Sequence, residues 1–99
     1  MRLTERQTQL IKRAVAILAG EEAQVMLFGS RVDDAQKGGD IDLLVTLSEE
    51  VTHPAELSAK ISARLIRQFQ GRKVDVLLQA PNLKILPIHS IAQQRGIVL

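Results

Sequence analysis

Hydrophobic residues recur in the first part of the chain with the spacing of an α-helix, which predicts a helix over residues 4–19. Thr4 with Gln7 three residues later resembles a capping box, and Gly20 is typical of a helix end. The apolar positions of this helix are Leu10, Ile11, Ala14, Ile17 and Leu18.

Three short apolar runs, at residues 24–28, 40–47 and 73–78, predict β-strands. The first is almost unbroken and ends at a glycine, as a buried strand does. The second begins with alternating acidic and apolar residues. In the third, Asp75 alternates with apolar neighbours, so a strand would place it on the face opposite Val74.

A second long helix is predicted to begin at Pro54, a residue favoured in the first turn, with Thr52 or His53 as its cap and Gly71 as its end. Its apolar face consists of Leu57, Ile61, Leu65, Ile66 and Phe69.

Further along, the pattern predicts a short helix over about residues 87–95, stopped by Gly96, and an apolar tail at residues 97–99. The expected order is therefore helix, strand, strand, helix, strand, helix. We expect one α+β domain over residues 1–99, with a small mixed sheet and helices packed on one face. The other face would carry the acidic residues and lie open to solvent.

Composition narrows the possible functions. Hydrophobic residues make up 45% of the chain and charged residues 24%, which is typical of a globular protein, and no apolar run approaches the roughly 20 residues that span a bilayer. Residues 1–6 lack the apolar core of a signal peptide. With no cysteine, thiolate metal sites and disulfides are excluded, and we expect a cytoplasmic protein without membrane association.

The chain offers few groups for zinc or for nucleic-acid stacking. Only His53 and His89 carry imidazole, so a metal would be held by oxygen, which favours Mg²⁺ or Mn²⁺. The net charge of +2 is scattered, and Phe28 and Phe69 are the only aromatic residues. Direct nucleic-acid binding is therefore not expected.

The segment from Gly29 to Asp42 carries the clearest chemical signal. Asp40 and Asp42 open the second strand two residues apart, so they project from one face. Close carboxylates repel each other unless they share a proton or bind a cation. Gly29 and Ser30 form a turn that lets backbone N–H groups and a hydroxyl approach phosphate oxygens. Arg31 could bind a phosphate or be an exposed loop arginine.

Asp75 is the candidate for a third carboxylate. If its strand lies beside the second strand, Asp75 could share a metal with Asp40 and Asp42 and accept the proton of an attacking hydroxyl. The alternative is a solvent-facing residue on an edge strand. Arg64, Arg67, Arg72 and Lys73 cluster near the end of the second helix, either as a solvated face or as a surface for an acidic partner or RNA.

Taken together, these residues resemble the minimal nucleotidyltransferases of the DNA polymerase beta superfamily. The signature is Gly29-Ser30, a nine-residue spacer, Asp40-Ile41-Asp42 opening a strand, and a lone Asp75 on a later strand. Gly38-Gly39 stands where the family usually has a serine before the first aspartate, which keeps the turn but loses a hydroxyl.

The resemblance implies a polymerase-beta-like fold and transfer of AMP from ATP with one or two Mg²⁺ ions. Asp40, Asp42 and Asp75 would be the metal ligands and catalytic residues, and Gly29, Ser30 and Arg31 would hold the nucleotide. It also implies a helical HEPN-type toxin as partner in a hetero-oligomer, with this chain as the antitoxin that adenylylates a tyrosine hydroxyl of the toxin.

Two other functions stay open at this point. A non-catalytic antitoxin could silence its partner by complex formation alone. Nucleotide transfer to a small molecule or RNA is less favoured, because the chain has no accessory domain and few aromatic residues.

Overall fold

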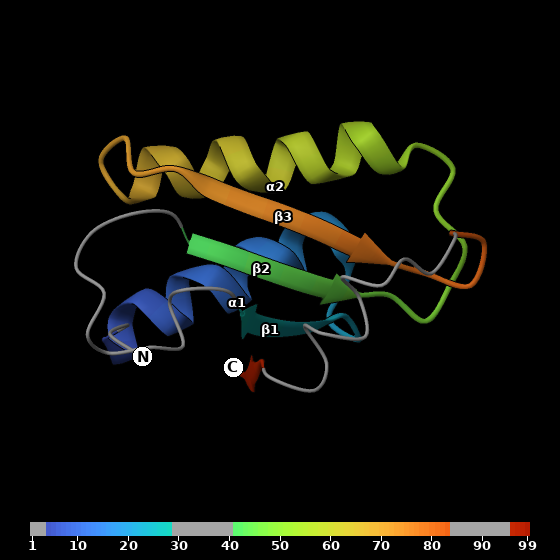
Figure 1. The fold of residues 1–99 in the computed structure, drawn as a ribbon, viewed down its shortest axis with the longest axis horizontal. Coiled ribbons are helices and arrows are strands. Elements are labelled where there is room, and N and C mark those ends of the chain that lie inside the picture. Colours follow the sequence, from blue (N-terminus) through green and yellow to red (C-terminus); the bar gives the residue numbers. More distant parts are fainter. Residues whose placement is uncertain (1–3, 29–40, 84–95) are drawn as a thin grey trace.

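Helices and strands follow one another almost as the hydrophobic pattern predicts. A computed structural model of the chain describes residues 4–28, 41–83 and 96–99 (Figure 1). The two long helices and the first three strands are confirmed, with ends that differ from the prediction by three residues at most. In chain order the elements are α1 (Glu5–Ala19), β1 (Gln24–Phe28), β2 (Ile41–Thr46), α2 (Pro54–Gln68), β3 (Val74–Gln79) and β4 (Ile97–Val98).

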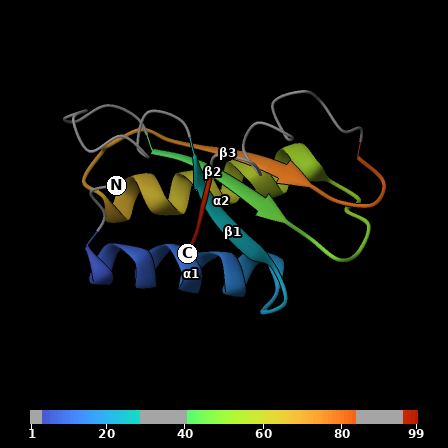
Figure 2. The same cartoon turned by 60° about the horizontal axis from the view of Figure 1, so that its bottom comes forward.

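The strands form one mixed sheet in the order β3-β2-β1-β4. β1 pairs antiparallel with β2 and with β4, whereas β2 and β3 are parallel and are joined by α2. Both helices lie on the same side of this sheet (Figures 1 and 2). The predicted α+β architecture, with helices on one face of a small mixed sheet, is therefore confirmed.

The end of the chain differs from the prediction. Residues 97–99 were expected to be only an apolar tail, but Ile97 pairs with Leu27, and the Leu99 N–H donates to the Val25 carbonyl at 3.0 Å. Ile97–Val98 thus forms the edge strand β4. Two residues are too few to show an alternating pattern, which explains why the prediction was wrong. The short helix predicted over residues 87–95 lies outside the described residues.

Both ends of α1 are held as the sequence indicates. The Gln7 N–H donates to the Thr4 hydroxyl at 3.1 Å, and the Thr4 N–H donates to the Gln7 side-chain oxygen at 2.8 Å. This reciprocal capping box satisfies two N–H groups that a helix start leaves unpaired. At the other end, the Gly20 N–H donates to the Ala16 carbonyl, with Gly20 at a positive φ of 102°.

One hydrophobic core fills the space between the helices and the sheet. α1 and α2 each contribute one stripe, and the strands contribute every second residue. Its buried members are Ile11, Ala14, Val15, Val25, Leu27, Ile41, Leu43, Val45, Ile61, Leu65, Val74 and Leu78.

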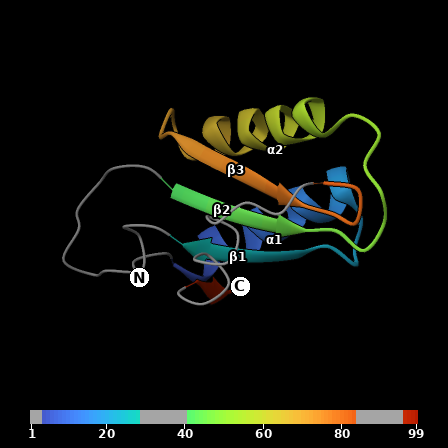
Figure 3. The same ribbon diagram turned by 45° about the vertical axis from the view of Figure 1, so that its right-hand side comes forward.

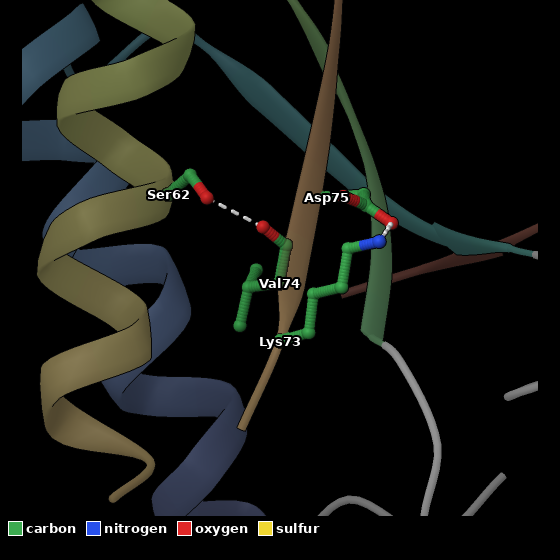
Figure 4. Close-up of polar contacts among 4 residues, drawn as sticks. All are labelled: Ser62, Lys73, Val74 and Asp75. Atoms are coloured by element: carbon green, nitrogen blue, oxygen red, sulfur yellow. Dashed lines mark hydrogen bonds and ion pairs between the residues drawn. The ribbon is translucent and has the colours of Figure 1, made fainter. Parts of the chain in front are cut away.

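The β3 edge of the sheet is closed by two serines of α2. The carbonyl of Lys73 accepts from β2, so the next carbonyl, that of Val74, points away from the sheet. The Ser62 hydroxyl donates to this Val74 carbonyl (Figure 4), and the Ser58 hydroxyl donates to the Val76 carbonyl at 2.8 Å. The helix thereby satisfies backbone acceptors that would otherwise invite another strand.

Replacing Ser62 by alanine is expected to lower the free energy of unfolding by about 1 kcal/mol, since a part-buried acceptor loses its donor. Alanine has the higher helix propensity, so a gain in stability would contradict the role of this hydrogen bond. Urea unfolding followed by circular dichroism measures the difference. Ser48→Ala is the control for an exposed serine, whose hydroxyl donates to Glu22 at 3.4 Å, and it should change stability by less than about 0.5 kcal/mol.

No helix in the described ranges is both long enough and apolar enough to cross a membrane.

Candidate active site

Asp42 and Asp75 lie side by side on neighbouring strands. β2 and β3 are parallel, and their register pairs Asp42 directly with Asp75. Directly paired residues of adjacent strands project from the same face, and the strands are about 4.8 Å apart. The sequence-based condition for recruiting Asp75, a strand adjacent to that of Asp42, is therefore met.

Hydrophobic burial determines which face the two carboxylates occupy. Ile41 and Leu43 flank Asp42 in the chain, and both are fully buried against the helices. Because side chains alternate along a strand, Asp42 and Asp75 must project from the face that carries no helix. A slip of the pairing by one residue would move a carboxylate into the core, so burial of these neighbours stabilises the register.

The acidic face is only partly open to solvent. Asp75 is exposed and Asp42 is half-buried. Leu44, two residues beyond Asp42 on the same face, has no exposed surface and does not belong to the core cluster beneath the sheet. The expectation of an open face is thus confirmed at Asp75 and wrong at Leu44. Beside Asp42, on the other neighbouring strand, lies Phe28.

A lysine accompanies the two carboxylates. The Lys73 Nζ lies 3.9 Å from the Asp75 Oδ2, and the two side chains are 64% and 52% exposed (Figure 4). From the sequence, Lys73 was assigned to the basic cluster near the end of the second helix, and not to the site of Asp75. The period of two in a strand could have identified it, because Lys73 precedes Asp75 by two residues and so shares its face.

Several predicted site residues lie outside the described residues. They are Gly29, Ser30, Arg31 and Asp40. Of the two histidines, His53 takes the N-cap position of α2 without a side-chain hydrogen bond to the helix, in agreement with one of the two predicted caps. His89 also lies outside the described ranges.

The donor set suits a hard divalent cation. Carboxylate oxygens, such as those of Asp42 and Asp75, are the ligands that Mg²⁺ prefers. Within residues 4–28, 41–83 and 96–99, no three acidic or histidine residues gather as a metal-binding group. The paired carboxylates therefore fit part of a Mg²⁺ site, and the third predicted ligand, Asp40, adjoins the start of β2 in the sequence.

Comparison with known families gives one match. The family model described as polymerase beta, nucleotidyltransferase matches residues 11–99, which include both carboxylates and all four strands. The curated proteins give no match.

Proposed function

The chain belongs to the polymerase beta nucleotidyltransferase family, and from this premise we propose that it transfers AMP from ATP to a hydroxyl group of a partner protein. The pairing of Asp42 with Asp75 across β2 and β3 is the observation that carries this proposal, because it supplies two carboxylates, which are hard oxygen donors, on the sheet face that carries no helix.

The residues take the following roles in the proposal. Asp42 and Asp75, together with Asp40, would hold Mg²⁺, and Gly29, Ser30 and Arg31 would bind the triphosphate. When bound, Mg²⁺ supplies positive charge that offsets the negative charge of the phosphate oxygens.

The proposed reaction is an in-line displacement at the α-phosphorus of ATP. The acceptor hydroxyl oxygen forms the new bond to phosphorus, the bond to the β-phosphate oxygen breaks, and pyrophosphate leaves. Asp75 would take the hydroxyl proton in this proposal, a role supported by the exposure of its side chain beside Asp42.

For the acceptor, we propose a tyrosine of a helical HEPN-type toxin, which this chain would neutralise as an antitoxin. This step rests on the likeness of the motif to the minimal nucleotidyltransferases. The alternative, an antitoxin that silences the toxin by binding alone, needs no transferred AMP, so one measurement separates the two.

The test is co-expression of the chain with the protein encoded by the gene next to its own, followed by intact-mass analysis of that protein. Added AMP masses that disappear when Asp75 is replaced by asparagine would support transfer. A neutralised partner of unchanged mass, together with no transfer of label from α-labelled ATP, would overturn the enzymatic proposal in favour of binding.

Lys73→Met is expected to raise the KM for ATP about fivefold and to change kcat less. Lys73 places a positive charge beside Asp75, where an anionic triphosphate would approach, and exposed charge pairs are worth up to about 1 kcal/mol. Steady-state kinetics of label transfer measure both constants.

Lys73→Arg should restore the KM, since the positive charge returns. Lys60→Met removes an equally charged, exposed lysine from α2 and is the matched control. An unchanged KM in Lys73→Met would show that this lysine has no part in nucleotide binding.

A further inference from the structure

A groove runs along the outer flank of α1, away from the carboxylates. It has a volume of about 570 Å³ and lies between α1, the start of β1 and the end of the chain after β4. Figure 2 shows α1 beneath the sheet, and Figure 3 shows the C-terminal strand beside β1. Its apolar lining comes from Ala16, Ile17, Ala23, Val25 and Leu99.

α1 presents a second stripe to this groove, distinct from the stripe that faces the core. Gln9, Arg13 and Ala16 follow one another at intervals of three and four residues, the spacing of one helix face. Ile17 extends this stripe and is 58% exposed, which is unusual for a large apolar residue in the described part of the chain. Ala16 is small, so another element can approach α1 closely.

Cationic side chains outnumber acidic ones among the described residues that line the groove. Lys12 and Arg13 are both exposed, and Glu21 is the one acidic side chain in this set. Among the described residues, neither of the two cations makes an ion pair. An apolar strip bordered by two available cations is complementary to an amphipathic segment that carries acidic residues.

We propose that this groove binds a helix of a partner protein, with an apolar stripe against Ile17 and Ala16 and Asp or Glu residues against Lys12 and Arg13. A helix suits the site because side chains spaced three and four residues apart can follow the stripe of α1. The proposal does not depend on the nucleotidyl transfer proposed above.

Other occupants fit the groove less well. In the described part of a second copy of this chain neither helix is acidic, since α1 and α2 each contain one glutamate. Nucleic acid would lack a stacking surface, because no aromatic residue lines the groove. Two cations beside a concave surface are a weak anchor for a flat anionic membrane.

The groove and the carboxylates lie on opposite sides of the sheet. α1 covers the core face, whereas Asp42 and Asp75 project from the other face. A partner held along α1 would therefore leave the carboxylates accessible.

The test uses the full-length chain and a synthetic helical peptide of about 18 residues, with a leucine stripe at helical spacing flanked by glutamates. A second peptide has the same stripe flanked by lysines. In ¹⁵N NMR titrations, the acidic peptide should shift amide signals of residues 9–25 and of Leu99, whereas the basic peptide should not. No shift at about 1 mM acidic peptide would overturn the proposal, because groove-binding helices associate more tightly than this.

Ile17 is exposed in the free chain and would be buried by the bound helix. Ile17→Gln should therefore weaken binding of the acidic peptide about tenfold, because the transfer free energy of the isoleucine side chain out of water is lost. Val98→Gln is the matched control, since Val98 is 66% exposed and does not line the groove. Equal effects of the two substitutions would overturn the assignment of Ile17.

Replacing Lys12 and Arg13 together by glutamine should weaken binding about fivefold and reduce its dependence on salt. The matched control replaces Lys60 and Arg67, two exposed cations of α2, in the same way. Stronger shifts of the same groove amides with duplex DNA or with anionic vesicles than with the acidic peptide would assign the groove to those ligands and overturn the proposal.

Discussion

Asp42→Asn is expected to reduce nucleotidyl transfer roughly a thousandfold, because the proposed function makes Asp42 a Mg²⁺ ligand and neutralising such a carboxylate removes several kcal/mol of charge stabilisation. Asp42 lies on the central strand β2, directly beside Asp75, and asparagine keeps its shape while removing its charge. Transfer of label from α-labelled ATP to the co-expressed partner measures the rate.

This loss of activity should occur without a large change in stability. Asparagine removes the like-charge repulsion with Asp75 and keeps the shape and one carbonyl oxygen of the side chain, so the free energy of unfolding should change by less than about 1 kcal/mol. Glu56→Gln removes one carboxylate from the exposed face of α2 and is the control for net charge. If Asp42→Asn transferred nucleotide as fast as the unchanged protein, Asp42 would be excluded from the active site.

Leu44→Ala is expected to lower the free energy of unfolding by about 3 kcal/mol, the usual cost of removing a fully buried leucine side chain. The effect is informative because Leu44 lies on the face of the sheet opposite α1 and α2. A large cost would show that this face has its own buried apolar contacts, next to the carboxylates. Urea denaturation measures the change, and the m-value of the variant should equal that of the unchanged protein.

Two substitutions calibrate this value. Leu43→Ala, one residue earlier and on the core face, should cost about as much, whereas Ile17→Ala, at an exposed position, should cost less than about 1 kcal/mol. If Leu44→Ala were as mild as Ile17→Ala, the burial of Leu44 would contribute little to the fold.

Local patterns were sufficient to predict most of the architecture. The capping box of α1 involves only Thr4 and Gln7, three positions apart, so the local sequence is enough to predict it. The same is true of the apolar stripe of α2 and of Pro54 in its first turn. The family signature then assigned Asp75 to the same site as Asp40 and Asp42, but the adjacency of β2 and β3 that pairs Asp42 with Asp75 stayed a condition until the structure showed it.

Features that depend on distant pairing were harder to predict. β4 forms because Ile97 meets Leu27 from the other end of the chain, and two residues carry no period of their own. The burial of Leu44 was missed for a related reason: alternation predicts which face a residue occupies, but not what covers that face. Lys73 was assigned to a basic cluster by proximity in the sequence, although the strand places it with Asp75.

The parallel pairing of β2 and β3 has a consequence for folding. The two strands are separated in the chain by the whole of α2, and no local hairpin can bring Asp42 beside Asp75. The loop-closure entropy of this crossover must be overcome before the carboxylates meet, so the pair forms together with the packing of α2 on the sheet. A partly folded chain that retains only the antiparallel pairing of β1 with β2 would have one carboxylate in place and would lack the pair on which the proposed activity depends.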